Sequence, residues 1–304
     1  MKILYTGGGT LGSVSPLIAI HEKLKEKLET RNQKLETLWL GTKFGPERAI
    51  VENEDIEFKP IISGKFRRYF DLQNLIDLFK IKFGFWQSLF IILKFKPDVI
   101  LTAGSFVAVP VAWAGFFSGV PVFVHQQDVE VGLANKLMAP IAKKITVALE
   151  KSLQDFKKEK TFLVGNPIRE KLRNKEIERL REKIIINFSN NLPMVLILGG
   201  GTGALALNEL VWQSLPELTK FCNIIHLTGK NKTMNNEFGI MNYGENYKQF
   251  EFLNEEIFTA IQMADVVVSR AGMSALTELA YFSKPTIIIP IPDSHQEENA
   301  LYFI

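Results

Sequence analysis

The sequence predicts an α/β protein of two domains, each built on a parallel β-sheet. Short β-branched runs alternate with amphipathic segments along the whole chain, which is typical of parallel strands joined by covering helices. The length of 304 residues suits two domains of ordinary size. Each half of the chain also begins with an apolar run that a glycine-rich turn follows.

The expected strands fall into two sets of five. The first set comprises Ile3–Thr6, Leu35–Leu40, Asp98–Thr102, Val120–Val124 and Ile145–Ala148. The second set comprises Met194–Leu198, Ile224–Thr228, Tyr247–Phe252, Val266–Ser269 and Thr286–Pro290. Helices are expected between them, for example over Leu17–Leu28, Leu205–Leu218 and Ile257–Met263.

The boundary between the domains is expected at the turn Val164–Pro167, which the charged stretch Arg169–Lys183 follows. We therefore expect an N-terminal domain over residues 1–164 and a C-terminal domain over residues 165–304.

The composition excludes several classes of protein. With 46% hydrophobic and 23% charged residues, the chain is neither disordered nor a collagen-like repeat. Its single cysteine, Cys222, excludes an internal disulfide and a multi-cysteine zinc site, so a reducing cytoplasm is the expected location. The first residues lack the features of a signal peptide.

One long stretch, Val99–Gln127, contains no charged residue. Its length would allow a membrane-spanning helix, but glycines and prolines divide it at Gly104, Pro110, Gly115, Gly119 and Pro121. We therefore expect a buried strand, a short helix and a second strand here.

Two glycine-rich turns follow apolar runs, Gly7–Ser13 in the first half and Gly199–Ala204 in the second. Backbone N–H groups of such turns can approach a ligand closely, and the next helix begins with its positive end there. Both turns therefore suit a diphosphate, and the alternative for each is a tight turn that binds nothing.

The first turn also matches the dinucleotide pattern at Gly7, Gly9 and Gly12. That pattern requires an acidic residue at the end of the next strand to bind the ribose. The run ending at Thr42 has none, and the one ending at Gly229 has none either. Lys230 lacks the flanking residues of a nucleoside-triphosphate loop, so NAD and ATP are disfavoured as ligands.

Six motifs occur in one order over almost the whole chain and resemble the MurG family of N-acetylglucosaminyltransferases of peptidoglycan synthesis. They are Gly8-Gly9-Thr10 with Gly12 and Pro16, His125-Gln126-Gln127, Gly165–Arg169, Gly199-Gly200 with Gly203-Ala204 and Asn208, Ser269–Gly272 with Glu278, and Asp293 with Gln296 and Asn299-Ala300. The resemblance implies a GT-B fold, in which two Rossmann-like domains with parallel sheets face each other. It also implies that the C-terminal domain binds the nucleotide-sugar and the N-terminal domain binds the acceptor.

The resemblance carries over a set of donor-binding residues. Glu278 matches the family's ribose-binding glutamate, a role that suits a carboxylate because it accepts two hydrogen bonds. Leu253 matches the position whose backbone reads uracil, and Arg169 matches an arginine near the diphosphate. The other implied donor contacts are Thr10, Gly12, Gly200, Gly201, Thr202, Gly203, Gln296 and Asn299. The Thr202 hydroxyl and neighbouring amides would stabilise the UDP leaving group.

The implied acceptor-binding residues are Gly9, Ser13, Gly104, Ser105 and Gln127. Here the chain departs from the family, because Ser13 stands in place of a histidine and Gln126 in place of a glutamate. Asp128 replaces a family asparagine, and Ser105 and Val109 replace glycines. Neither Ser13 nor Gln126 can accept a proton near neutral pH. His125 and Asp128 are therefore the candidate catalytic bases, and a buried, hydrogen-bonded His125 is the alternative.

The family continues beyond the position that matches Ile304. We therefore expect the C-terminal domain to be truncated in this sequence, with a naturally shortened relative as the alternative.

Residues 65–96 are both basic and aromatic. They contain seven basic and two acidic residues within a chain whose net charge is +3. Basic residues beside aromatic ones favour a helix that lies in an anionic membrane interface, with a buried helix as the alternative. A nucleic-acid patch is disfavoured because no binding module is recognisable. The expected membrane contacts are Lys65, Arg67, Arg68, Phe79, Lys80, Lys82, Phe83 and Trp86.

Together these features predict an inverting, metal-independent transferase at the cytoplasmic face of the bacterial membrane. It would move N-acetylglucosamine from UDP-GlcNAc to lipid I, the undecaprenyl-linked muramyl pentapeptide, without a cofactor. Two alternatives stay open: a related enzyme with another lipid acceptor, and a non-catalytic UDP-sugar-binding relative.

Overall fold

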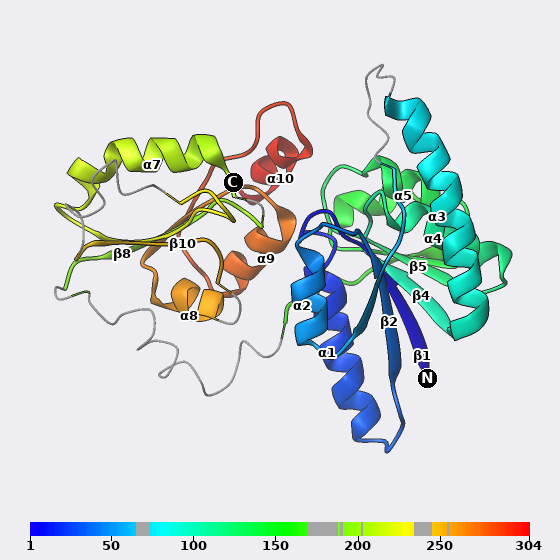
Figure 1. Ribbon diagram of the computed structural model, residues 1–304. Coiled ribbons are helices and arrows are strands. Elements are labelled where there is room, and N and C mark those ends of the chain that lie inside the picture. Colours follow the sequence, from blue (N-terminus) through cyan, green and yellow to red (C-terminus); the bar gives the residue numbers. More distant parts are fainter. Residues whose placement is uncertain (65–72, 170–187, 189–190, 202, 234–244, 254–255) are drawn as a thin grey trace. The chain divides into compact units, whose positions relative to one another are not determined.

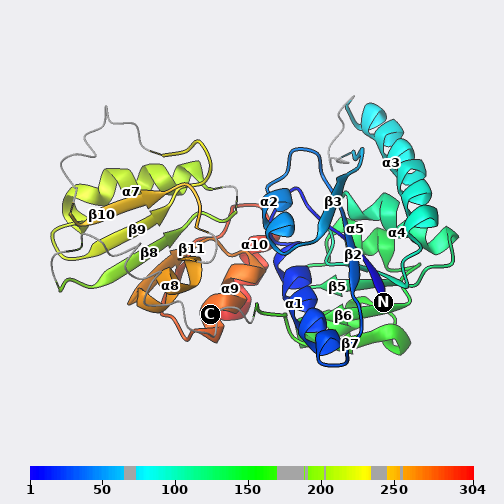
Figure 2. The ribbon, with the colours of Figure 1, turned by 60° about the horizontal axis from the view of Figure 1, so that its bottom comes forward.

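A computed structural model describes residues 1–64, 73–169, 188, 191–201, 203–233, 245–253 and 256–304. The chain divides into two compact units, Met1–Glu170 and Lys171–Ile304. Each unit contains one sheet with helices on both faces, as Figures 1 and 2 show. Every strand pair in both sheets is parallel, so the predicted α/β class is confirmed.

The first unit has a seven-stranded sheet in the order β3-β2-β1-β4-β5-β6-β7. Its strands are β1 (Lys2–Thr6), β2 (Glu36–Gly41), β3 (Glu57–Pro60), β4 (Val99–Thr102), β5 (Val122–Gln126), β6 (Lys144–Val147) and β7 (Thr161–Leu163). Its α-helices are α1 (Ser15–Glu29), α2 (Glu47–Asn53), α3 (Gln73–Phe95), α4 (Ala108–Phe117) and α5 (Leu133–Met138). The short 3-10 helices η1 (Glu150–Asp155) and η2 (Lys158–Lys160) precede β7.

Two hydrophobic cores cover the two faces of this sheet. Tyr5 and Trp39 pack with Leu17 of α1 and Val51 of α2 on one face. On the other face, apolar strand residues such as Ile100 pack against α3, α4 and α5. Figure 1 shows the corresponding division, with α1 and α2 on one side of the sheet and α3 and α4 on the other. Successive strand residues therefore alternate between two buried faces, as expected for a covered parallel sheet.

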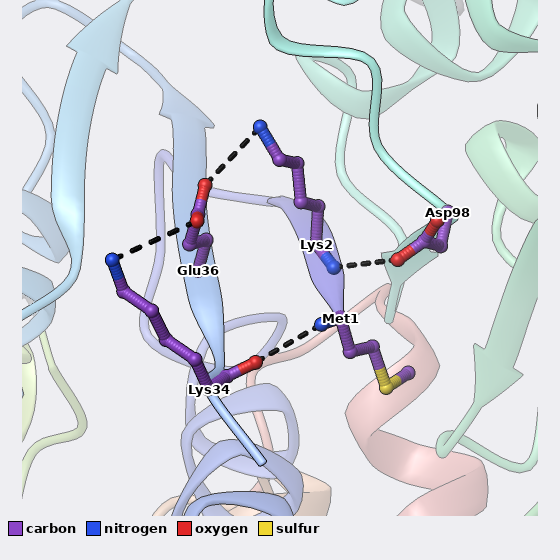
Figure 3. Close-up of polar contacts among 5 residues, drawn as sticks. All are labelled: Met1, Lys2, Lys34, Glu36 and Asp98. Carbon is purple, nitrogen blue, oxygen red and sulfur yellow. Dashed lines mark hydrogen bonds and ion pairs between the residues drawn. The ribbon is translucent and has the colours of Figure 1, made fainter.

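Polar contacts fasten the beginning of β1 to its neighbours (Figure 3). The Lys2 backbone N–H donates to Asp98 Oδ2 at 2.6 Å, and the Met1 ammonium donates to the Lys34 carbonyl at 3.0 Å. Lys2 Nζ lies 3.1 Å from Glu36 Oε2, and this hydrogen bond and charge lower the pKa of the Glu36 carboxyl. Because the Lys2–Glu36 pair is exposed, its contribution to stability is small.

The second unit has a five-stranded sheet in the order β10-β9-β8-β11-β12. Its strands are β8 (Met194–Leu198), β9 (Asn223–Leu227), β10 (Tyr247–Phe250), β11 (Val266–Ser269) and β12 (Thr286–Ile288). Its described helices are α7 (Leu205–Leu218), α8 (Glu256–Met263), α9 (Met273–Tyr281) and α10 (His295–Phe303). Buried Ile197, Leu215 and Ile224 belong to the core beneath α7.

The two sheets repeat the same strand order, since β10-β9-β8-β11-β12 corresponds to β3-β2-β1-β4-β5. One side-chain contact is repeated as well. Asp265 Oδ2 accepts from the Met194 backbone N–H at 2.7 Å, as Asp98 does from Lys2 in the first unit. In each unit an aspartate just before the fourth strand therefore fixes the start of the first.

The structure adds two strands that the sequence analysis did not include, β3 and β7. Both are short edge strands. β3 has no fully buried residue and lacks the apolar run of an internal strand, and β7 has only three residues. β5 is also shifted from the expected Val120–Val124, which places His125 and Gln126 within the strand.

The uncharged stretch Val99–Gln127 forms β4, α4 and β5, as predicted. Within the described residues, no helix is both long enough and apolar enough to cross a membrane.

Candidate functional site

Most of the predicted site residues lie at the carboxyl ends of the parallel strands. The strand order reverses between β1 and β4 in the first unit and between β8 and β11 in the second. In open α/β sheets, ligands bind outside the carboxyl ends of the strands at such a reversal. The two glycine-rich turns follow β1 and β8, so each stands at this position in its own unit.

The first glycine-rich turn is held from three sides. Trp39 Nε1 donates to the Gly7 carbonyl at 2.9 Å, and the Ser105 hydroxyl donates to the Gly8 carbonyl at 2.6 Å. The Gly9 backbone N–H donates to Glu47 Oε2 at 3.1 Å. Side chains from β2, α2 and the loop after β4 therefore fix three successive residues of the turn.

Glu47 is a site residue that the sequence analysis missed. It is fully buried at the start of α2, although nothing in its spacing from the glycines distinguishes it from a solvated acid at a helix start. Its second oxygen, Oε1, accepts from the Thr42 N–H at 2.7 Å and from the Thr42 hydroxyl. Only the folding of β2 beside β1 brings this carboxylate to the turn.

Ser105, a predicted acceptor contact, adopts a left-handed backbone with φ +93°. This conformation is costly for a residue with a Cβ and is ordinary for glycine. The strain explains why the family pattern has a glycine at this position. The hydrogen bond from the Ser105 hydroxyl to Gly8 helps to offset that cost.

The glutamines after His125 organise the loops rather than exposing reactive groups. Gln127 Nε2 donates to the Gly12 carbonyl at 2.8 Å and so joins the loop after β5 to the first glycine-rich turn. Gln126 Nε2 donates to the carbonyls of Asp128 and Glu130 at 2.7 and 3.0 Å. Its Oε1 accepts from Asn135 Nδ2 at 2.7 Å.

His125 uses both ring nitrogens inside the protein. Nδ1 lies 2.9 Å from Thr146 Oγ1, and Nε2 lies 3.1 Å from Asn166 Oδ1. The side chain is buried, and burial lowers the pKa of the imidazole. To accept a substrate proton, His125 would have to break one of these bonds.

The remaining acceptor candidates lie in the same group of loops. Ser13 is buried, and its Oγ has no hydrogen-bond partner in the described part of the chain. Gly104 follows β4 and receives a hydrogen bond from Thr102 Oγ1 at its carbonyl. Asp128 is half-buried in the loop after β5. The structure thus joins Ser105 to Gly8 and Gln127 to Gly12 through hydrogen bonds that link adjacent loops.

The second glycine-rich turn packs tightly against the end of β9. A Cβ at Gly203 would overlap the Thr228 carbonyl, and Gly203 has φ +72°, so only glycine fits there. The Gly203 N–H donates to the Gly200 carbonyl at 2.9 Å, which closes the turn. Gly200 and Gly201 are exposed, whereas Thr202 lies outside the described residues.

A buried hydrogen-bond network lies beneath this turn. Asn208 Nδ2 donates to the Thr228 carbonyl at 2.9 Å, and Asn208 Oδ1 lies 3.1 Å from His226 Nε2. His226 Nδ1 lies 3.0 Å from the Tyr247 hydroxyl, which accepts from Trp212 Nε1. Because an amide oxygen only accepts, His226 Nε2 carries the proton.

Burial is the main cause of the pKa shifts of the two titratable side chains in this network. It lowers the pKa of His226 to about 4 and raises the pKa of Tyr247 to about 12. Both side chains are therefore neutral near pH 7, and they support α7 and the end of β9.

Of the other predicted donor residues of the second unit, Glu278 lies on α9, Gln296 and Asn299 lie on α10, and Leu253 follows β10. Glu278 is half-buried in α9. Asn299 is fully buried in α10, and its Nδ2 donates to the Ala271 carbonyl at 3.1 Å. Gln296 Oε1 accepts from the Ile291 N–H at 3.2 Å, and Leu253 is buried after β10. Asn299 therefore joins α10 to the turn before α9, and Gln296 fastens the loop before α10.

Arg169, expected near the donor diphosphate, is held by two carboxylates of the first unit. Its Nη2 lies 3.0 Å from Glu54 Oε1, and its Nε lies 3.3 Å from Glu22 Oε1. The side chains of Glu22 and Glu54 are 8% and 6% exposed. Arg169 thus balances part of a buried negative charge in this structure.

Apolar side chains of α3 and α4 form an exposed surface, here called the α3–α4 surface. Its members are Ile76, Phe79, Phe83, Trp86, Phe90, Leu93, Phe116 and Phe117. Lys80 and Lys82 are exposed on the same helix, and Lys80 also pairs with the buried Asp77 at 2.9 Å. The predicted contacts Lys65, Arg67 and Arg68 lie outside the described residues.

Comparisons with known proteins agree over both units. Residues 3–147 match the glycosyltransferase family 28 N-terminal domain, and residues 194–304 match the family's C-terminal domain. A relative from Clostridium kluyveri is 39% identical over 290 residues, which cover 95% of this chain and 79% of that protein. A relative from Clostridium tetani is 40% identical over 295 residues, covering 95% and 78%. Both are named UDP-N-acetylglucosamine--N-acetylmuramyl-(pentapeptide) pyrophosphoryl-undecaprenol N-acetylglucosamine transferase.

Two solved structures support the fold. The crystal structure of Acinetobacter baumannii MurG has a TM-score of 0.67 at 24% identity, covering 99% of this chain and 82% of that one. A UDP-GlcNAc 2-epimerase from Neisseria meningitidis, bound to UDP-GlcNAc, has a TM-score of 0.70 at 13% identity, covering 99% and 85%. These likenesses confirm the GT-B fold.

Proposed function

Because this chain belongs to glycosyltransferase family 28, and within it to the MurG family, we propose that its substrates and chemistry are those of its relatives. The chain is an N-acetylglucosaminyltransferase of peptidoglycan synthesis. It transfers N-acetylglucosamine from UDP-GlcNAc to lipid I and so forms lipid II. The observation that carries this conclusion is identity of about 40% over 95% of the chain to transferases of that name.

In the reaction, the muramyl C4 hydroxyl attacks the anomeric carbon while the bond to the UDP oxygen breaks. The leaving diphosphate gains negative charge, and the attacking hydroxyl loses a proton. The protein must therefore stabilise an anion on one side and accept a proton on the other. A single attack at the anomeric carbon inverts its configuration.

We assign the acceptor site to the N-terminal domain and the donor site to the C-terminal domain, with the boundary at residues 164 and 165. The support for the donor assignment is the second glycine-rich turn, where exposed Gly200 and Gly201 precede α7. Backbone N–H groups before a helix suit a diphosphate. Glu278 would bind the ribose hydroxyls, and Gln296 and Asn299 would lie close to the sugar.

For the proton acceptor we assign Asp128 in preference to His125. Both nitrogens of His125 already have partners within the protein, and burial weakens it as a base. Asp128 is half-buried in the same loop, and Gln126 and Gln127 join that loop to β5 and to the first glycine-rich turn. A carboxylate on this loop can accept the hydroxyl proton.

We further assign the α3–α4 surface to contact with the membrane that carries the lipid acceptor. Large aromatic side chains are exposed beside lysines on α3, with Phe83 63% and Trp86 58% exposed. This combination suits an interface with anionic lipid. The enzyme would then work as a peripheral protein at the cytoplasmic face of the bacterial membrane, and nucleic acid is not an expected partner.

The direct test is a transfer assay with labelled UDP-GlcNAc and lipid I in detergent. We expect labelled lipid II and an equal amount of released UDP. Omitting lipid I should abolish both products, and a lipid carrying a different sugar should give little transfer. Binding of UDP-GlcNAc without any transfer to lipid I would contradict the proposed function and favour a non-catalytic relative.

A further inference from the structure

The peptide group between Gly8 and Gly9 is held at both of its polar atoms. Its carbonyl accepts from the Ser105 hydroxyl at 2.6 Å, and its N–H donates to Glu47 Oε2 at 3.1 Å. A peptide between two glycines is unusually free to rotate because neither neighbour has a Cβ. The two side chains therefore fix a peptide plane that the local sequence leaves undetermined.

The site around Glu47 requires two hydrogen-bond acceptors. Oε2 faces the Gly9 N–H, while Oε1 faces the N–H and the hydroxyl of Thr42. A carboxylate meets this need with both oxygens, whereas a glutamine amide would turn an NH₂ donor toward another donor. Because Glu47 is fully buried, water cannot correct such a mismatch.

Neighbouring glycines leave the space that this carboxylate occupies. A Cβ at Gly8 or at Gly45 would overlap the Glu47 carboxylate. The first glycine-rich turn and the loop before α2 are thus shaped around Glu47.

We propose that Glu47 is a positioning residue for the acceptor reaction, which holds the Gly8–Gly9 peptide so that Thr10–Ser13 stand in their productive conformation. This inference rests on the proposed function, because it assigns Gly9 and Ser13 of the first glycine-rich turn to the acceptor. Gly12 in the same turn is joined to Gln127, and Gln127 adjoins Asp128. A change in the Gly8–Gly9 peptide would therefore alter the position of the proposed base, Asp128. The contacts within the second unit would not change.

The test compares Glu47→Gln with Glu52→Gln, a matched control on the same helix. Glu52 is exposed and forms a surface pair with Arg48. KM and kcat are measured for lipid I and for UDP-GlcNAc, together with hydrogen–deuterium exchange of the fragment Gly7–Ser13. Ser105→Ala, which releases the other end of the peptide, serves as a second variant if Glu47→Gln does not fold.

For Glu47→Gln we expect kcat/KM for lipid I to fall at least tenfold and exchange in Gly7–Ser13 to increase. The dissociation constant of UDP-GlcNAc should rise by less than threefold, because only Thr10 and Gly12 of this turn are among the implied donor contacts. Glu52→Gln should match the wild type. Unchanged acceptor kinetics, or an equal loss in donor affinity, would overturn the proposal. If the wild type itself transfers nothing to lipid I, the proposed function fails. The exchange measurement then still tests whether Glu47 holds the turn. Unchanged exchange in Glu47→Gln would overturn this positioning role as well.

Discussion

Arg169 Nη2 donates to Glu54 Oε1 at 3.0 Å, although the family resemblance places this arginine near the donor diphosphate. Glu22 lies on the other side of the guanidinium, and both carboxylates are almost completely buried. Arg169 thus pairs with two buried carboxylates. In such an arrangement, removing one partner strongly destabilises the fold, because it leaves a buried charge without that pairing.

Replacing Arg169 with methionine should destabilise the first unit by about 3 kcal/mol, because two buried carboxylates would each lose an ion pair. Urea unfolding measures this change. The triple variant with Glu22→Gln and Glu54→Gln should recover most of the stability. If Arg169 also contacts the diphosphate, UDP-GlcNAc affinity should remain reduced in the triple variant. Full recovery of affinity would contradict the donor role.

Glu278→Ala should weaken UDP-GlcNAc binding by about 1–3 kcal/mol, the range for losing hydrogen bonds to a charged group. Isothermal titration calorimetry provides the measurement. Glu217→Ala is a suitable control, since Glu217 is an exposed helical glutamate of the same unit that pairs with Lys220 at the surface. Equal affinities for the wild type and the Glu278 variant would refute the ribose assignment.

Asp128→Asn should lower kcat by about 10²–10⁴-fold, as expected for loss of a general base, while UDP-GlcNAc affinity stays the same. His125→Gln should act mainly on stability, because it disturbs the buried bonds to Thr146 and Asn166. Steady-state kinetics and thermal unfolding separate the two effects. A folded His125 variant that loses activity as completely as Asp128→Asn would reverse the assignment.

His226 should make the second unit less stable in acid. Its pKa of about 4 in the folded protein lies below the ordinary 6.5. As the pH falls, the unfolded chain therefore binds a proton at this residue at a higher pH than the folded chain does. The contribution of His226 to the free energy of unfolding should therefore be fully present above pH 6.5. It should fall by about 3 kcal/mol as the pH approaches 4.

The measurement is the free energy of unfolding from pH 7 to pH 4, compared between wild type and His226→Gln. The variant should lack this part of the decline. His295→Gln, which changes an exposed histidine on α10, should keep it. Identical slopes for wild type and His226→Gln would show that His226 does not titrate as described.

Replacing Lys80, Lys82 and Phe83 with serine should reduce binding to anionic vesicles at least tenfold. Each lysine near such a surface contributes about 1 kcal/mol, and exposed Phe83 adds apolar contact. Vesicle co-sedimentation tests the change. A matched control replaces Lys220, Phe221 and Lys230, which are also exposed but lie in the second unit. Equal losses in both variants would argue against a specific α3–α4 surface.

Local patterns in the sequence were enough to predict the α/β class and most of the internal strands. β8 and β11 agree with the prediction residue for residue, because buried parallel strands require continuous apolar runs that neighbouring segments do not share. The short edge strands β3 and β7 were missed, whereas the edge strands β10 and β12 were predicted. The glycine-rich turns were predicted from glycine content alone.

The tertiary structure decided which side chains act on those turns. Glu47 lies 38 residues from Gly9, and Glu54 lies 115 residues from Arg169. His125 likewise meets Thr146 and Asn166 only through packing of separate segments. Spacing along the chain carries no information about such contacts, because they arise where parallel strands bring distant loops to one edge of a sheet. The sequence by itself therefore determined the elements and their class, and the fold alone determined the partners of each charged and polar group.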